Sequence, residues 1–493
     1  MPAKRSLTLA LALLLVAAIP ARATGFPEIH VVDVRSGFGP SSALHEGSAE
    51  LDGWLYFSAY DDTHGYELWR TNGTTSELVK DIVDGPGTSY PGGYTTFKGY
   101  VYFVATITHD HYSLWRTDGT PENTTLVVDI APDAEQSGID YLVASGDTLY
   151  FRGYDPVHGT EIWRSDGTSE NTRLIKDINP APGTMPWNLT AHDGALYFTE
   201  DDGVHGTELW RTDGIDGTEA HTKMVKDIKS TGGDSSNPYS LTALGSSLYF
   251  IADDGTNGFE LWRTDGTEAH TEMVKDLGPS TNINSLKAFN GSIYMNADDG
   301  VHGFALWRSD GTAATTKLIK GTDPVNANGY GPERMTPVGN WLYYSNWDSD
   351  HSAELWRTDG TTANTTLMSD INPGVGDSLP GNFVAIGDAL YFTAYDGTGT
   401  KLWRATTDGS LTSSTITGSN VSYDSHYASL GGRLFIPFVS DETGQEFAYV
   451  DEPTYGLPPT DREDSSWSTA LVIFAAITAV AGVVVSRREA TRA

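Results

Sequence analysis

A short phrase recurs along this chain and limits its fold more than any other feature. The phrase is Leu/Ile-Trp-Arg, often preceded by Glu and followed by Thr-Asp-Gly-Thr, with its tryptophans at 69, 115, 163, 210, 262, 307, 356 and 403. Successive tryptophans are 45 to 52 residues apart, a period between those of WD40 and kelch blades. Such a chain folds as an array of similar units rather than as unrelated domains.

Each unit contains four short segments with the composition of β-strands. In the clearest unit they cover residues 240–244, 248–252, 259–263 and 273–277, and Thr264-Asp265-Gly266-Thr267 predicts a tight turn before the last. The second and third segments are apolar on both faces, so neighbouring sheets must cover both sides. The sequence therefore predicts an all-β protein, a β-propeller of eight or nine four-stranded blades.

The two ends of the array complement each other. Residues 30–34 match the fourth strand of a unit with no preceding strands, whereas residues 434–449 match a second and third strand with no fourth. We expect the N-terminal strand to complete the last blade, with Ala448 in the place of the tryptophan. This closure removes the sheet edges that an open solenoid, the alternative, would leave.

Four copies of the phrase, at residues 67–74, 208–214, 260–267 and 354–361, resemble the ELWxxDGT repeat family. The resemblance covers about residues 30–451. It departs from the family pattern at Asn72, Ser113, Ala305 and Lys401. The resemblance implies a large, secreted microbial surface protein with a repeat architecture, and it implies no particular activity.

The two ends of the chain predict export and anchoring. Residues 1–23 have a basic start, an apolar run and an Ala-Arg-Ala cleavage site, which are typical of a signal peptide. The repeat array then covers residues 24–452, and an acidic, proline-containing linker covers 453–466. Residues 467–486 predict a C-terminal transmembrane helix, and the basic tail 487–493 predicts a cytoplasmic end. We expect a single-pass cell-surface protein with its N-terminus outside.

Composition narrows the range of partners. The net charge is −34, which argues against nucleic acid as a ligand because phosphates select basic surfaces. The absence of cysteine excludes disulfides, thiol catalysis and cysteine metal sites. Calcium is the one cofactor that the acidic charge leaves open.

No set of residues stands apart from the repeat as catalytic machinery. Asp and His recur in loops such as 61–64, 201–205 and 298–302, where we expect them to satisfy loop backbone groups rather than bind metal. We therefore predict a non-catalytic, adhesive surface module that binds an extracellular glycan or protein. The alternatives are a polysaccharide hydrolase or lyase, and a purely structural component of the cell envelope.

The predicted ligand-binding residues are those that the repeat does not explain. Trp187 lies in a connection between units, Tyr239 takes the matching place in the next unit, and Trp347 lies in a loop between the second and third strands. Exposed aromatic faces at such places can stack on sugar rings. Acidic neighbours, Asp202, Asp348 and Asp350, are predicted to bind hydroxyls or bridge through a cation.

Six Asn-x-Ser/Thr sequons predict a glycoprotein in a host that modifies them. They begin at Asn72, Asn123, Asn188, Asn290, Asn364 and Asn420.

Overall fold

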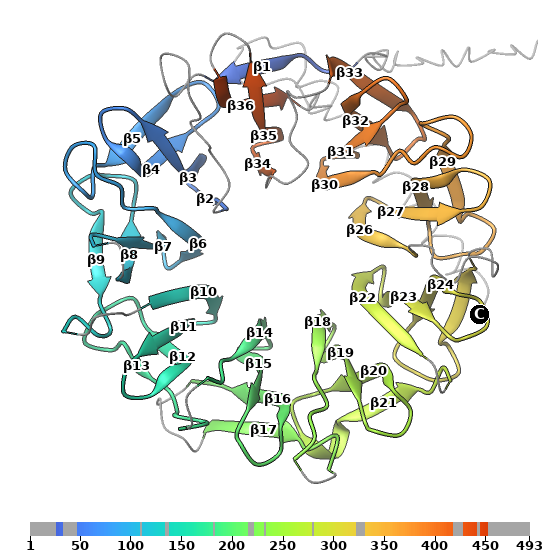
Figure 1. Cartoon of the computed structure of the whole chain (residues 1–493), viewed down its shortest axis with the longest axis horizontal. Coiled ribbons are helices and arrows are strands. Elements are labelled where there is room, and N and C mark those ends of the chain that lie inside the picture. Colours follow the sequence, from blue (N-terminus) through green and yellow to red (C-terminus); the bar gives the residue numbers. More distant parts are fainter. Residues whose placement is uncertain are drawn as a thin grey trace, which may run out of the picture. The chain divides into compact units, whose positions relative to one another are not determined.

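The computed structural model describes residues 26–32, 47–108, 111–133, 138–180, 183–214, 221–230, 233–278, 281–321, 331–417, 427–440 and 444–451. These residues form nine four-stranded antiparallel sheets, which are blades set around a central opening (Figure 1). This confirms the all-β propeller and fixes the number of blades at nine. Within the described ranges the one helical element is a 3-10 turn, η2 (Glu268–His270).

The predicted signal peptide, linker, transmembrane helix and basic tail lie outside the described residues, as does Asn420. Among the residues that are described, no helix is long and apolar enough to cross a membrane.

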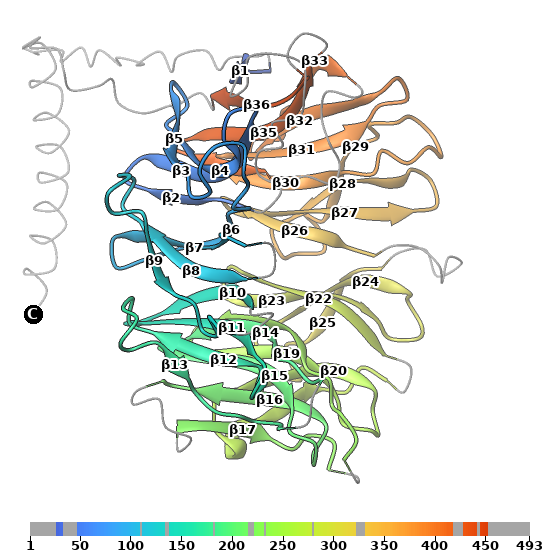
Figure 2. The same ribbon diagram turned by 60° about the vertical axis from the view of Figure 1, so that its left-hand side comes forward.

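The first four blades follow one another in chain order (Figure 2). Blade 1 contains β2 (Ala49–Leu51), β3 (Trp54–Asp61), β4 (Gly65–Thr71) and β5 (Ser76–Lys80). Blade 2 contains β6 (Gly92–Phe97), β7 (Tyr100–Thr106), β8 (Tyr112–Thr117) and β9 (Thr125–Val128). Blade 3 contains β10 (Gly138–Ser145), β11 (Thr148–Asp155), β12 (Gly159–Ser165) and β13 (Arg173–Leu174). Blade 4 contains β14 (Trp187–His192), β15 (Ala195–Asp201), β16 (Thr207–Thr212) and β17 (Thr222–Lys226).

Blades 5 to 8 repeat this order, with the first strand of each blade innermost (Figure 1). Blade 5 contains β18 (Tyr239–Leu244), β19 (Ser247–Asp253), β20 (Phe259–Thr264) and β21 (Glu272–Lys275). Blade 6 contains β22 (Asn282–Phe289), β23 (Ser292–Asp298), β24 (Phe304–Ser309) and β25 (Lys317–Lys320). Blade 7 contains β26 (Glu333–Val338), β27 (Trp341–Asp348), β28 (Ser352–Thr358) and β29 (Thr366–Ser369). Blade 8 contains β30 (Gly381–Ile386), β31 (Ala389–Tyr395), β32 (Thr400–Thr406) and β33 (Leu411–Thr417).

Blade 9 is built from both ends of the array. Its inner strands are β34 (Ala428–Leu430), β35 (Arg433–Ser440) and β36 (Gly444–Asp451), and its outer strand is β1 (Ile29–Val32). Val31 pairs with Ala448, as Leu78 pairs with Trp69 in blade 1. The predicted closure, and the placing of Ala448 at the tryptophan position, are therefore confirmed.

The repeated phrase forms the joints between blades. Six of the eight tryptophans are 5% to 9% exposed, which confirms that they pack in the core. The turn glycine packs against the second-strand tyrosine of the preceding blade, so that a Cβ on Gly119 would collide with the Tyr56 hydroxyl. The arginine of the phrase then donates to a carbonyl in the next blade, as Arg116 Nη1 does to Gly167 O at 3.0 Å. Each interface between neighbouring blades is thus made by the Leu-Tyr-Phe segment of one blade and the Trp-Arg-Thr-Asp-Gly segment of the other.

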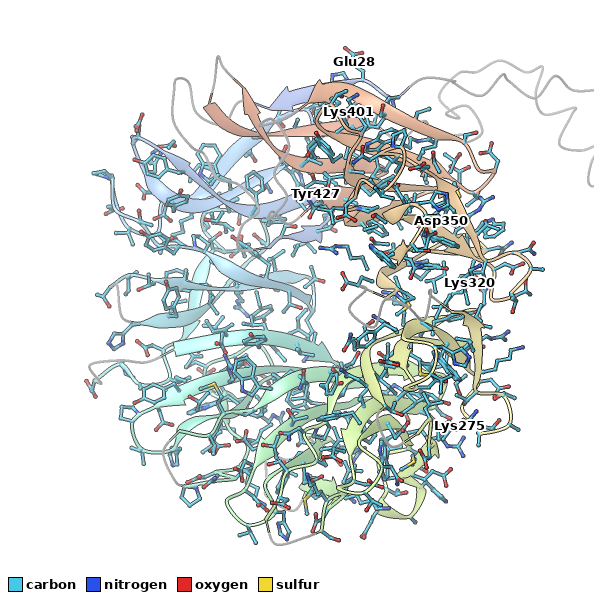
Figure 3. The ribbon with its side chains drawn as sticks, turned by 45° about the vertical axis from the view of Figure 1, so that its right-hand side comes forward. Glu28, Lys275, Lys320, Asp350, Lys401 and Tyr427 are labelled. Carbon is cyan, nitrogen blue, oxygen red and sulfur yellow. The ribbon has the colours of Figure 1, made fainter. Side chains whose placement is uncertain are left out.

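The lysines that end the fourth strands also cross these joints. Lys226 Nζ donates to Thr271 O at 2.9 Å and Lys275 Nζ to Thr316 O at 3.0 Å in the next blade. Lys275 and Lys320 each also face the tryptophan ring of the following blade (Figure 3).

The turn before the fourth strand is longer than predicted. Gly266 has the expected positive φ of 90°, but η2 follows it before β21 begins. The carboxylate of Asp265 holds this connection through the backbone N–H and hydroxyl of Thr267 and through the His270 ring.

In the blades that carry it, the glutamate of the phrase ties the blade to the connection that follows it. Glu67 is fully buried and accepts the backbone N–H groups of Ile82 and Ser89 and the Ser89 hydroxyl, at 2.9, 3.1 and 2.6 Å. Burial raises its pKa to about 7. These bonds fix the connections that form one face of the ring, where the candidate site lies.

Candidate functional site

The structure separates the two tryptophans that we predicted as one binding platform. Trp187 is the first residue of β14 in blade 4, and Trp347 is the seventh residue of β27 in blade 7 (Figure 1). Trp347 lies within a strand rather than a loop and pairs with Ala353, a register that Tyr60 and Tyr154 share in their own blades. The interpretation of Trp347 as an aromatic residue outside the repeat was therefore wrong.

Tyr239 takes the register that Trp187 has, as predicted, but in a different environment. Its ring meets Phe259 edge-on at 5.6 Å, and its hydroxyl donates to the carbonyl of Ile283 in the next blade. Burial raises its pKa to about 12. Tyr239 therefore joins blades 5 and 6 instead of offering a free ring.

Two of the three predicted acids have structural partners in their loops. Asp202 accepts the backbone N–H groups of Val204 and His205, and Asp348 accepts those of Asp350 and His351. Each also contacts the ring of the histidine three residues later. Burial raises the pKa of Asp202, but its hydrogen bonds with His205 and the Val204 N–H outweigh burial and hold that pKa below its ordinary value. Asp350 is exposed at the tip of the loop in blade 7 (Figure 3). Within the described ranges no group of three or more His, Asp or Glu is placed to hold a metal ion.

Trp187 belongs to a cluster of aromatic side chains around one arginine. The guanidinium of Arg152, in β11, lies 4.4 Å from the ring centres of both Tyr141 and Trp187. The two rings meet edge-on at 5.9 Å, and Tyr141 and Trp187 are 50% and 45% exposed. Both aromatic faces are therefore available to a ligand while the cation that organises them is buried.

Arg152 is fixed in this position by a fork of hydrogen bonds. Its Nε and Nη2 donate to the two oxygens of Asp140 at 2.7 and 2.6 Å, and its Nη1 donates to Pro186 O at 3.3 Å. A bidentate pair of this kind sets geometry as well as energy. Because the Asp140 side chain is half exposed, its remaining lone pairs face solvent beside the aromatic rings.

A cavity of about 720 Å³ opens next to this cluster. Its wall includes Tyr90, Tyr112, Tyr141, Arg152 and Tyr154, and its floor includes Gly92, Gly93 and Gly138. Tyr90 comes from the connection into blade 2, and Tyr154 comes from the end of β11. The connection into blade 2 and the end of β11 therefore meet around this cavity.

Two of these tyrosines hold an unusual backbone conformation. Tyr90 has φ of 46° and Tyr141 has φ of 50°. A bulky residue in the left-handed region is uncommon. At the Tyr141 position five other blades hold the same positive φ, with Gly93, Asn188, Ser240, Arg334 and Asn382, so this conformation belongs to the repeat.

Arg152 and Glu200 were not among the predicted site residues, which were aromatic residues outside the repeat and acids near them. At the register of Arg152 the other complete blades carry Ser58, Val104, Thr199, Ile251, Asn296, Ser345 and Thr393. At the register of Glu200 they carry Ala59, Ala105, Gly153, Ala252, Ala297, Asn346 and Ala394. Alignment of the second strands would have found both charges, and they fall in adjacent blades.

Glu200 is a buried acid in β15, at the side of blade 4. It is 1% exposed, and neither carboxyl oxygen accepts a well-formed hydrogen bond from the described residues. Burial, with the carboxyl of Glu161 nearby, raises its pKa to about 9, and Arg152 only partly offsets this. Glu200 is therefore protonated at neutral pH and lies behind the site rather than in contact with a ligand.

The predicted glycosylation sites have local structural roles. The side-chain amides of Asn123 and Asn364 donate to Asp118 and Asp359, both at 2.7 Å, and so cap the turn after the repeated phrase. The amide of Asn188 donates to Pro238 O at 3.2 Å. Asn72 accepts the N–H groups of Thr74 and Thr75, whereas Asn290 is exposed in the hairpin between β22 and β23.

No family model and no curated protein matches this chain. Among solved structures it is similar to a prolyl endopeptidase, 13% identical over 71% of this chain and 54% of the other, with a TM-score of 0.41. It is also similar to puromycin hydrolase, 12% identical over 85% and 63% with a TM-score of 0.39, and to oligopeptidase B from Leishmania major, 11% identical over 71% and 53% with a TM-score of 0.40. The chain thus spans 53% to 63% of the length of these three proteins, and the likeness concerns the fold alone.

Proposed function

We propose that this chain is a non-catalytic surface module that binds a glycan at the cavity beside Arg152. The observation that carries the proposal is the pair of exposed aromatic faces, Tyr141 and Trp187, fixed around a buried arginine. Flat apolar faces cover sugar rings, while a half-exposed carboxylate such as Asp140 accepts hydrogen bonds from hydroxyls. A protein ligand of the same site is the alternative within this class.

The nearby carboxyl groups that the structure describes favour glycan binding over cleavage by a hydrolase or lyase, because they are not placed as a catalytic pair. A glycosidase uses two carboxyls that flank the bound sugar, one as acid and one as base or nucleophile. Around this cavity Asp140 is held by Arg152, and Glu200 is buried. Turnover of any captured glycan, followed by reducing-end assay, would support the enzyme instead.

The first experiment compares the two separated tryptophans. The full chain, Trp187→Ala and Trp347→Ala are applied to a glycan array under the same conditions. We expect Trp187→Ala to lose capture and Trp347→Ala to keep it, because Trp347 lies three blades away along the ring. Full capture by Trp187→Ala would place the ligand elsewhere.

We also propose a cell-surface location and membership of the ELWxxDGT repeat family. The support is the signal-like start at residues 1–23, the apolar run at 467–486 and the octapeptide itself. Protease added to intact cells should release a soluble propeller by cutting within residues 453–464. A propeller that stays protected inside the cell would contradict the location.

A further inference from the structure

The aromatic residues continue beyond the cavity into blade 1. Tyr90, in the cavity wall, stacks on Tyr66 of β4 at 5.7 Å with 23° between the rings. Tyr66 in turn packs against Tyr60 of β3 at 5.0 Å. From Tyr60 through the cavity to Trp187, aromatic side chains thus follow four successive blades. We call these residues the aromatic row.

The first pair of the aromatic row is special to blade 1. At the register of Tyr60 or of Tyr66 other blades also carry aromatic residues, namely Phe259, Phe304, Trp347 and Tyr395, but each of these blades has only one of the two. Tyr60 pairs with Tyr66 in blade 1, whereas the same pair is Asp201 and Thr207 in blade 4, and Trp347 and Ala353 in blade 7. The positive-φ position of Tyr90 is taken by Asn237 and Leu379 elsewhere. Packing of the propeller does not require tyrosine at these positions, so their concentration on adjoining blades calls for a ligand that spans them.

We infer that the aromatic row binds an extended, uncharged polysaccharide chain, which rests on and deepens the proposed function. A single terminal sugar is covered by Tyr141 and Trp187 alone and leaves Tyr60, Tyr66 and Tyr90 without a role. A chain that enters over Trp187 and crosses the cavity toward Tyr66 uses both groups. The cavity between them, at about 720 Å³, leaves room for sugar units that connect them.

Charge decides against an acidic polysaccharide. The chain carries a net charge of −34, and the one cation in the cavity wall, Arg152, is paired with Asp140. A polyuronate or sulfated chain brought along this face meets repulsion, whereas a neutral chain does not. Hydroxyl groups suit the half-exposed Asp140 carboxylate, which can accept hydrogen bonds from them.

The test is the dependence of affinity on chain length in the full protein. Cello-, laminari- and manno-oligosaccharides, from disaccharide to octasaccharide, are titrated by calorimetry, with oligogalacturonate and a proline-rich peptide as further ligands. We expect one neutral series to bind, with affinity rising about tenfold or more from the shortest to the longest chain, a gain of about 1.4 kcal/mol for each factor of ten.

Variants taken from the repeat itself keep the fold. Tyr66→Thr places the residue of Thr160 and Thr207 in blade 1, and Tyr90→Asn places the residue of Asn237, which holds the same φ of 46°. Tyr66→Thr should lower octasaccharide affinity about tenfold and leave disaccharide affinity unchanged, whereas Tyr90→Asn, in the cavity wall, should lower the affinity for both. Tyr395→Ala is the matched control, since Tyr395 shares the register of Tyr154 and its 38% exposure but lies in blade 8.

Each outcome decides between the two proposals. Equal affinity for short and long neutral chains overturns the aromatic row as a binding surface and leaves the glycan site standing. Preference for oligogalacturonate overturns the neutral ligand. Binding of the proline-rich peptide alone, or of none of these ligands, overturns the inference and the proposed function together.

Discussion

Arg433 Nη1 donates to the backbone carbonyl of Asn72 at 2.9 Å, across 361 positions of the chain. The contact joins blade 9 to blade 1, and it reproduces the joint that Arg357 Nη1 makes with Thr407 O between blades 7 and 8. Arg357 reaches its carbonyl from the third strand and stacks on Trp341 of the second, whereas Arg433 comes from the second strand and stacks on Tyr449 of the third. Arginine and aromatic residue have exchanged strands, yet the joint is the same.

Ring closure by β1 is the first prediction. A mature chain that begins at Ser36 lacks β1 and leaves the backbone groups of β36 unpaired at an open sheet edge. We expect a lower melting temperature and aggregation, measured by calorimetry and light scattering against a chain that begins at Gly25. Identical melting and scattering of the two chains would contradict closure by this strand.

A glycine of the repeated phrase is the second prediction. Gly360 and Gly374 both have φ of 95°, but a Cβ on Gly360 collides with the Tyr294 hydroxyl, whereas one on Gly374 meets nothing. Gly374→Ala should therefore cost about 1 kcal/mol of backbone strain. Gly360→Ala should cost clearly more, because the joint between blades 6 and 7 must open. Equal costs in chemical denaturation would show that the glycine is needed for φ alone.

Much of this architecture could be predicted from the sequence because the phrase recurs eight times at a nearly constant spacing, although the number of blades stayed at eight or nine. The blade architecture and the strand order followed from the repeat period and from the apolar second and third strands. Ring closure followed from the unpaired segments at both ends. The partners of Lys226 and Lys275 could not be predicted, since a lysine near many acids gives no sign that it reaches a carbonyl in the next blade.

The candidate site was predictable only in part, for a related reason. Trp187 stood out as an aromatic residue beyond the repeat, but Tyr239 in the same register is half-buried and packs against Phe259, and the sequence does not distinguish the two. What differs is the neighbour: Arg152 lies beside Trp187. This site lies where several neighbouring blades depart from the repeat. It can be identified only after the strands of these blades have been aligned by register.

The third prediction concerns the repeat tryptophans. Trp262 is 6% exposed and donates from Nε1 to Ala252 O at 3.1 Å within blade 5. Trp262→Ala should lower the free energy of unfolding by about 3–5 kcal/mol, as large-to-small core changes do. Trp187→Ala, at a residue 45% exposed, serves as the comparison and should cost less than about 1 kcal/mol. Urea denaturation measures both, and equal losses would refute the distinction between packing and exposed tryptophans.

Glu200 gives the last prediction, in which removal of a buried ionisable residue stabilises the protein. Its pKa is about 9 in the folded chain and about 4.3 in an unfolded one. Between these values the native state keeps a proton that the unfolded state has lost, so the free energy of unfolding falls as pH rises, by up to about 1.4 kcal/mol per pH unit. Glu200→Ala, which installs the residue of Ala252, removes this slope.

The expected result is therefore a difference that grows with pH. Near pH 4 the variant and the parent should unfold at similar denaturant concentrations, and at pH 8 the variant should be the more stable. Glu208→Ala is the control. Glu208 pairs with Glu200 across the sheet, but it accepts hydrogen bonds from the Ser236 hydroxyl and the Ile228 N–H. Its removal leaves these buried donors without an acceptor, so the variant should be less stable than the parent at every pH. Parallel pH profiles for Glu200→Ala and the parent would mean that Glu200 is ionised in the folded protein and paired with Arg152.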